Sequence, residues 1–412
     1  MKINIMQQID HYAGPVICKL LLFLRSFTRP ARPSDHLRLP DNPRNILVIK
    51  FFGIGTILLA SPALRELKKK YKNAKITMLT LSQNHELCEI LSCIDNAVYL
   101  NIESPLGFLV SLLRTIPEIR KRDFDIVIDL EFLTNFSALV ALLVTLFDRP
   151  RVTVGFSSPI NWRNRIHNIN VSFDHSRHIT RIFAKMFCSL TGETFEPSFE
   201  FERAALLQRM DREYTNKLFS SNAGLEEANS LICVNVNAGD LSLHRRWPKD
   251  YFAEVIKELI KRPDVAVVLI GAGSDVEYVS ELKRLLPPSS RIVDVSGGTD
   301  IKELIGLFAK SKLLITNDSG PFHLAEVIGL PTVSFFGPET PYLYGPIDKK
   351  HYVFYEDLYC SPCLNIYNSK MSHCKNNTCL KNIKPGRVIK AIDEICNIPG
   401  QKDRLESDLA RL

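Results

Sequence analysis

The sequence lacks an apolar run of the roughly 18 residues that a membrane-spanning helix needs. The stretch SALVALLVTLF at 137–147 is about half that length and is typical of a core helix. No low-complexity segment, short-period repeat or aromatic-basic RNA signature is present. Nucleic-acid binding is therefore not expected.

Cysteine is also sparse, with ten residues in 412, too few for a secreted scaffold built from disulfides. We therefore expect a reducing cytoplasm. The composition, 45% hydrophobic and 24% charged, is that of a folded protein, and the length predicts two domains. The net charge of +7 is mild and suits an anionic ligand or an acidic membrane surface.

An apolar stretch near the N-terminus, GPVICKLLLFLRSF at 14–27, is interrupted by Lys19 and followed by Arg29, Arg32 and Arg38. It has no small-residue cleavage site, which argues against a signal peptide. Two interpretations stay open: a helix packed on the protein's own surface, or one lying on an anionic leaflet. The second predicts a peripheral protein at the inner face of the plasma membrane.

Short apolar runs alternate with amphipathic helical patterns over the first half of the chain. Strands are predicted at 45–51, 74–81, 96–100, 124–130 and 151–156, with helices such as 60–71 between them. A polar, aperiodic region follows. This alternation predicts a doubly wound parallel sheet.

The alternation restarts after a segment that carries one predicted helix, 202–219. Further strands are predicted at 230–237, 265–273, 291–297, 312–318 and 331–337. The fold class is therefore α/β, with two Rossmann-like sheets facing across a cleft, and ligands are expected at the carboxyl ends of the strands. The predicted segments are 1–40 (N-terminal helix and linker), 41–200 (first domain), 201–229 (connector), 230–398 (second domain) and 399–412 (polar tail).

The stretch NDSGPFH at 317–323 lies where a predicted strand turns into a helix. Free backbone N–H groups at a helix N-terminus bind anions, and Asp318, Ser319, Gly320 and His323 are gathered there. The alternative is that Asp318 or Ser319 only caps the helix and His323 lies at the surface. The combination favours a diphosphate site.

Two further loops at strand ends carry candidate ligand groups. The first follows Asn237 and contains Arg245, whose guanidinium suits phosphate oxygens, while Arg246 fits a solvated charged loop. The second, LIGAGSDVEYV, contains Gly271 and Gly273, which would leave room for a base or ribose. A lone Gly-x-Gly is also common turn chemistry.

The first domain has its own glycine loop, KFFGIGT at 50–56. Gly53 and Gly55 would let a substrate approach the backbone, and Lys50 and Thr56 are polar members of the loop.

Four cysteines cluster near the C-terminus, at Cys360, Cys363, Cys374 and Cys379. The C-x2-C pair is compatible with a structural zinc site, with His373 as a rival ligand. Unpaired or disulfide-linked cysteines are the alternative.

Together, NILVIKFFGIGTILLASPAL, RRWPKDYFAEVIKEL and ITNDSGPFHLAEVIGLPTVSFFGP resemble the heptosyltransferase-type glycosyltransferases of family 9 over about residues 45–390. The resemblance implies a GT-B fold and inverting transfer of a sugar, typically heptose from ADP-heptose, to a lipopolysaccharide-core or other lipid-linked cell-envelope glycan. It implies that the first domain binds the acceptor and the second the donor diphosphate, through Asp318, Ser319 and Gly320, with His323 and Arg245 nearby and no cofactor required.

This chain departs from the family's pattern at two positions. Thr56 stands where the family has a general-base aspartate, and a threonine hydroxyl cannot deprotonate an acceptor at neutral pH. Gly273 stands where a ribose-binding acid is common. Glu131 or Asp129 could supply another carboxylate. A non-catalytic nucleotide-sugar-binding protein and a nucleotide-sugar epimerase are the alternatives to a transferase.

Overall fold

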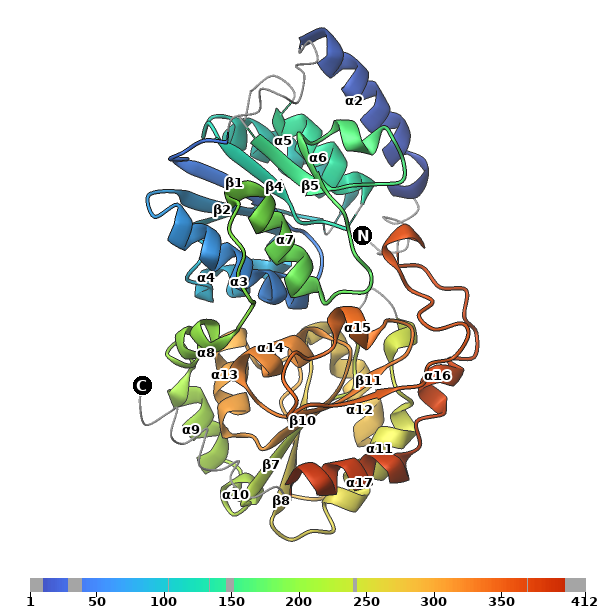
Figure 1. Ribbon diagram of the computed structural model, residues 1–412. Helices are drawn as coiled ribbons and strands as arrows, with labels where there is room; N and C mark the ends of the chain where they lie inside the picture. Colours follow the sequence, from blue (N-terminus) through green and yellow to red (C-terminus); the bar gives the residue numbers. More distant parts are fainter. Residues whose placement is uncertain are drawn as a thin grey trace. The chain divides into compact units, whose positions relative to one another are not determined.

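The computed structural model describes residues 10–28, 39–102, 104–132, 134–145, 152–239, 243–368 and 370–396. The predicted polar tail at 399–412 lies outside these residues. The chain divides into two compact units, Met1–Ser198 and Phe199–Leu412 (Figure 1). Each unit contains one parallel sheet of six strands with helices packed against it.

The sheet of the first unit has the strand order β3-β2-β1-β4-β5-β6. Its strands are β1 (Asn45–Ile49), β2 (Lys75–Leu81), β3 (Asn96–Leu100), β4 (Ile126–Asp129), β5 (Val152–Phe156) and β6 (Ile169–Val171). Its helices are α2 (Gly14–Thr28), α3 (Ile54–Lys70), α4 (His85–Ile90), α5 (Pro105–Arg120), α6 (Asn135–Thr145) and α7 (Ile179–Thr191). Buried aliphatic side chains of β1, β2 and β4 pack against α5 and α6.

The sheet of the second unit repeats this pattern, with the order β12-β11-β10-β7-β8-β9. Its strands are β7 (Ser230–Asn235), β8 (Val265–Ile270), β9 (Ile292–Asp294), β10 (Leu313–Asn317), β11 (Thr332–Phe336) and β12 (Tyr352–Tyr355). Its helices are α8 (Glu200–Leu207), α9 (Arg212–Ser220), α10 (Ala223–Glu226), α11 (Lys249–Leu259), α12 (Val276–Lys283), α13 (Ile301–Lys310), α14 (Gly320–Ile328), α15 (Pro341–Tyr344), α16 (Thr378–Lys381) and α17 (Pro385–Cys396).

The two sheets confirm the predicted class, because each is parallel and doubly wound. In each unit the chain changes direction along the sheet between two neighbouring strands, β1 and β4 in the first and β7 and β10 in the second. The carboxyl ends of such a pair leave a crevice in which ligands bind. The fold therefore predicts one ligand site at the carboxyl ends of β1 and β4 and another at the carboxyl ends of β7 and β10.

Several predicted boundaries were wrong. The helix expected at 60–71 begins at Ile54, so Gly55 and Thr56 lie in its first turn and only Gly53, with a φ of 84°, remains in the loop. The single helix expected at 202–219 is two, α8 and α9, because the Asp211 carboxylate accepts a hydrogen bond from the Tyr214 amide and starts a new helix. These helices pack on α13 and α14 of the second unit.

A partly buried histidine gives the second unit a pH-dependent stability. His351 lies just before β12, where its Nδ1 is 3.0 Å from the Thr332 hydroxyl, and burial lowers its pKa from 6.5 to about 4. Between about pH 6.5 and pH 4, His351 is therefore protonated in the unfolded chain and neutral in the folded chain. Stability should be retained above that window and fall by about 3 kcal/mol as the pH drops through it.

Urea midpoints measured between about pH 7 and pH 4 test this prediction. His351→Gln should flatten the dependence, whereas His85→Gln, at an exposed histidine, should leave it unchanged. An unaltered slope in His351→Gln would contradict the assignment.

Candidate functional site

The candidate donor site of the second unit is built at the carboxyl ends of β7 and β10. Asn235, the last residue of β7, donates through Nδ2 to the hydroxyl oxygens of Thr316 (3.1 Å) and Ser319 (2.9 Å). Asn317, the last residue of β10, donates to the carbonyl oxygens of Val236 (3.0 Å) and Asn237 (3.2 Å). These side-chain amides tie the two strand ends together and fix the loops that follow.

Arg245 reaches this crevice from the short 3-10 helix η4 (Leu243–Arg245). Its Nη1 donates to Asp318 Oδ2 at 3.1 Å, and its Nη2 donates to the Ala238 carbonyl at 2.6 Å. Both side chains are largely buried, so the pair is shielded from solvent. The structure therefore brings together Asn237, Arg245 and Asp318, which lie up to 81 residues apart in the sequence.

The helix α14 begins beside this ion pair. Ser319 is its N-cap residue, but its side chain makes no capping hydrogen bond, and Asp318 pairs with Arg245 instead of capping. His323 is buried, with Nε2 3.9 Å from Asp318 Oδ1 and Nδ1 3.9 Å from Glu326 Oε2. The alternative of a capping acid and a surface histidine was thus wrong, and the amides of Gly320 and Phe322 are the first-turn N–H groups that an anion could meet.

Unmatched polar atoms concentrate at this site. Among the described residues, seven buried side-chain atoms have no hydrogen-bond partner within the protein, and four of them are here. They are Asn237 Nδ2, Arg245 Nε, His323 Nδ1 and Glu326 Oε2. Two of the four atoms, Asn237 Nδ2 and Arg245 Nε, are hydrogen-bond donors, whereas His323 Nδ1 and Glu326 Oε2 face each other at 3.9 Å. Buried polar groups are normally paired, so the two free donors indicate a place that a ligand completes.

Arg246 also belongs to the site, contrary to its assignment to a solvated loop. Its Nε donates to Asn237 Oδ1 at 2.6 Å, and its guanidinium lies 4.1 Å from the ring centroid of Tyr278. Nearby, Gly273 opens the 3-10 helix η5 (Gly273–Asp275), and a Cβ there would meet no atom within 4 Å. Gly271 instead packs closely, since a Cβ would lie 2.9 Å from the Asp275 Cβ.

Sequence reasoning missed two charged residues at this site. Glu339 follows β11, and Lys370 comes from the segment that holds the four cysteines. The two form a largely buried ion pair, and Lys370 also donates to the Tyr344 hydroxyl at 3.2 Å. Burial raises the pKa of Glu339, the Lys370 charge opposes that rise, and the charges of Asp318 and Arg245 also act on it. Position after a strand could have flagged Glu339, but nothing in the sequence marks Lys370.

A buried ion pair joins the residues that follow β1 and β4, at the carboxyl ends of these strands, which we call the crest of the first unit. Lys50 Nζ lies 2.7 Å from Glu131 Oε1, which also accepts hydrogen bonds from the amides of Phe51 and Phe52. Lys50 is fully buried beneath the loop, so it holds the turn in shape and does not line its surface. Three donors thus converge on one oxygen of Glu131 and hold this carboxylate against the turn.

Thr56 and Asp129 lie near this pair. The Thr56 hydroxyl is directed at the carbonyl oxygens of Phe52 and Gly53, at 3.0 and 2.8 Å. Asp129 Oδ1 accepts from the Glu131 amide, and its Oδ2 is 3.6 Å from His167 Nε2. The Thr56 hydroxyl therefore donates its proton to backbone carbonyl groups, and it helps fix the first turn of α3.

The four C-terminal cysteines are free thiols, from the exposed Cys360 to the buried Cys379, whose pKa burial raises to about 11. Within the described ranges, no three His, Cys, Asp or Glu side chains are arranged to hold a metal ion. The four cysteines are unpaired here, which is one form of the predicted alternative, and the structural zinc site stays a prediction.

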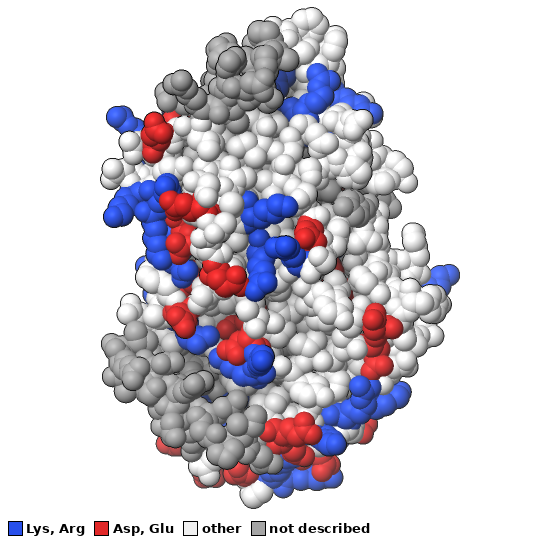
Figure 2. Space-filling model, viewed as in Figure 1, with Lys and Arg blue, Asp and Glu red and all other residues white. Residues whose placement is uncertain are grey.

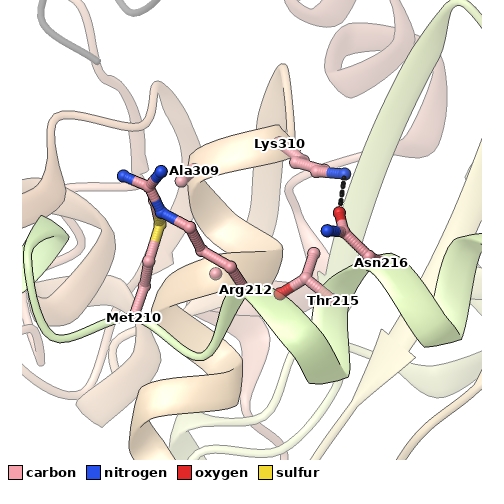
Figure 3. A pocket seen from close by; sticks show the side chains of 7 residues that line it. Met210, Arg212, Thr215, Asn216, Ala309 and Lys310 are labelled. Carbon is pink, nitrogen blue, oxygen red and sulfur yellow. Dashed lines mark hydrogen bonds between the residues drawn. The ribbon is translucent and has the colours of Figure 1, made fainter. Parts of the chain in front are cut away.

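A hollow of about 300 Å³ lies elsewhere on the second unit, between α9 and α13 (Figure 3). Lys310, Arg212 and Met210 are among the residues that line it, and Lys310 donates to Asn216 Oδ1 at 3.0 Å. It contains none of the predicted site residues, so the crevice at β7 and β10 remains the candidate donor site.

Comparisons with known proteins agree with this architecture. The sequence model of glycosyltransferase family 9 (heptosyltransferase) matches residues 112–373, so the chain belongs to that family. A lipooligosaccharide heptosyltransferase 2 of Campylobacter jejuni is 30% identical over 154 residues, which cover 37% of this chain and 47% of that protein. The chain thus aligns with about half the length of that relative.

Two solved structures share the fold. A family 9 glycosyl transferase of Veillonella parvula is 23% identical, with a TM-score of 0.66 over 86% of this chain and 97% of that one. An Escherichia coli heptosyltransferase solved with ADP is 16% identical, with a TM-score of 0.63 over 85% of this chain and 99% of that one. No described helix is long and apolar enough to cross a membrane.

Proposed function

We propose that the chain is an inverting glycosyltransferase that transfers heptose from ADP-heptose to a lipopolysaccharide-core or other lipid-linked cell-envelope glycan. The observation that carries the proposal is the set of unpaired polar atoms at the ends of β7 and β10. Asn237 Nδ2 and Arg245 Nε are donors, and they lie beside the N-terminus of α14. A donor diphosphate would satisfy all three.

The same groups would promote departure of the nucleoside diphosphate. Negative charge grows on the diphosphate as the bond from the sugar to its phosphate oxygen breaks, and a fixed guanidinium and helix N-terminus stabilise that charge without reorganising. Asp318 positions Arg245, and the open space beside Gly273 leaves room for the nucleoside. A relative solved with ADP supports an adenine nucleotide as the donor's leaving group.

We assign deprotonation of the acceptor by a general base a smaller contribution to the rate of sugar transfer. Thr56 cannot take a proton, and Glu131 is held by Lys50 and two amides. We therefore assign the first unit a role in orienting the acceptor, which can contribute as much as base catalysis does. A nucleotide-sugar-binding protein without transfer is the second candidate, because Thr56 removes the family's base.

A thermal-shift panel with ADP-, UDP-, GDP- and CMP-sugars tests the donor assignment. ADP-heptose at about a hundred times its dissociation constant should add roughly 2.7 kcal/mol of stability, and the other nucleotides should add little. ADP release on adding deacylated lipopolysaccharide core then separates a transferase from a binding protein. Stabilisation by another nucleotide sugar, or by none, would overturn the assignment of donor.

A further inference from the structure

The helix α2 presents a continuous apolar face outward. Val16, Leu20 and Phe23 have exposed fractions of 68, 57 and 60%, and Leu24 and Phe27 are exposed as well. Their spacing of three and four residues places them on one side of the helix. Single exposed apolar side chains are common on proteins, but a full helix face of them marks a contact surface.

This helix is firmly held by the first unit, so the exposed face has a fixed orientation. The Asp10 carboxylate accepts hydrogen bonds from the amides of Asn135 and Phe136 at the start of α6. A Cβ on Gly14 would lie 2.5 Å from the Asn135 Cβ, so glycine permits this close approach of the two helices. Near the other end, Arg25 donates to the Ile166 carbonyl at 3.0 Å.

The helix α5 carries a second apolar face. Leu106 and Leu113 have exposed fractions of 72 and 66%, and Leu109 and Val110 are exposed between them. Both α2 and α5 pack against α6, and Cys18 and Leu22 of α2 share a core cluster with Leu112 and Ile116 of α5. The two faces therefore flank the same helix, and we call them together the α2–α5 face.

The charges around this face have one dominant sign. Between Gly14 and Thr28 the sequence has Lys19 and Arg25 and no acid, and α5 carries Arg114 and Arg120 against Glu118. In Figure 2 the surface seen over α2 is white and blue, without red. Apolar side chains with basic neighbours suit an anionic lipid surface, where the side chains enter the acyl boundary and the cations meet headgroup phosphates.

We propose that the α2–α5 face docks the first unit onto the surface of an anionic bilayer. With 15 residues, α2 is about 22 Å long and would lie in the plane of the headgroups, its inner side remaining on α6. This occupant fits better than a second copy of the chain, because the basic side chains of two copies would repel one another across the contact. The proposal does not depend on the donor or on transfer.

Co-sedimentation of the full-length chain with vesicles tests the proposal. One set of vesicles is phosphatidylcholine alone, and the other contains about one third phosphatidylglycerol. The variants are Leu20→Ser/Phe23→Ser in α2 and Leu109→Ser/Leu113→Ser in α5. The matched control is Phe201→Ser/Leu285→Ser, which removes exposed apolar side chains from the second unit.

The parent chain should bind the anionic vesicles, and more weakly as salt is raised. Each α2 or α5 variant should lower the partition coefficient at least about tenfold, while the control variant should bind like the parent. Equal loss in the control, unchanged binding in both test variants, or equal binding to neutral vesicles would overturn the proposal. A dimer that light scattering detects in the parent but not in the variants, without vesicle binding, would assign the face to a second copy.

The response to ADP-heptose in the thermal-shift panel should be the same in these variants as in the parent chain. Failure of lipid binding is thereby distinguished from failure of the proposed function.

Discussion

Asp318→Asn should lower the rate of sugar transfer by about 10²- to 10³-fold, the loss typical of removing one preorganised electrostatic contact. The carboxylate of Asp318 orients Arg245 through the 3.1 Å contact of Oδ2 with Nη1. The amide that replaces it has no charge, so it holds the buried guanidinium less well and leaves its charge less compensated. The diphosphate would then meet a cation that is no longer fixed.

Steady-state ADP release measures this effect, with circular dichroism to show that the variant is folded. Asp393→Asn is the matched control, because Asp393 forms another Asp–Arg pair of the second unit, with Arg262. Arg245→Lys should also lose most of the rate, since an ammonium group cannot bind Asp318 and the Ala238 carbonyl in the same planar arrangement. A rate within threefold of the parent chain in Asp318→Asn would contradict the role given to this ion pair.

The fold was predictable wherever strands are buried on both faces. The continuous apolar runs of β1, β7, β8 and β10 predict strands that are buried on both faces. The helices that lie between successive strands predict that these strands pair in parallel. The edge strands β6 and β12 were missed. β6 has only three residues, and Asn170 interrupts its apolar pattern. β12 is apolar and aromatic in sequence but has only four residues, so a short run of this kind was passed over.

The candidate donor site was predictable only in part. Asp318 and Ser319 directly follow β10, and Arg245 lies in the loop after β7. Residues at strand ends gather at one edge of a parallel sheet. Lys370 reaches the site from just after a short 3-10 helix, Ile366–Asn368, through an ion pair with Glu339 that no local pattern encodes. The start of α3 at Ile54 was also missed, because nothing in the sequence decides whether Gly53 alone or both glycines form the turn.

Lys50→Met should destabilise the first unit by about 3–5 kcal/mol, because it leaves the buried Glu131 carboxylate without its counter-ion. Among the described residues, the amides of Phe51 and Phe52 would remain as its hydrogen-bond partners. Urea unfolding followed by hydrogen exchange of peptides from each unit measures the effect where it arises, since the chain need not unfold in one step. Lys261→Met, at an exposed pair with Glu258, should change stability by less than about 0.5 kcal/mol.

The double variant Lys50→Met/Glu131→Gln separates the charge from the hydrogen bonds. Glutamine keeps an oxygen for both backbone amides but carries no charge, so the pair of changes removes two buried ions and leaves no amide unpaired. The double variant should therefore be more stable than Lys50→Met alone by at least about 2 kcal/mol. If the loss of stability in the double variant equals the sum of the losses in Lys50→Met and Glu131→Gln, the ion pair does not set the stability of this crest. If instead the double variant is stable but transfers sugar slowly, the charges of Lys50 and Glu131 act on the acceptor and not only on the turn that holds it.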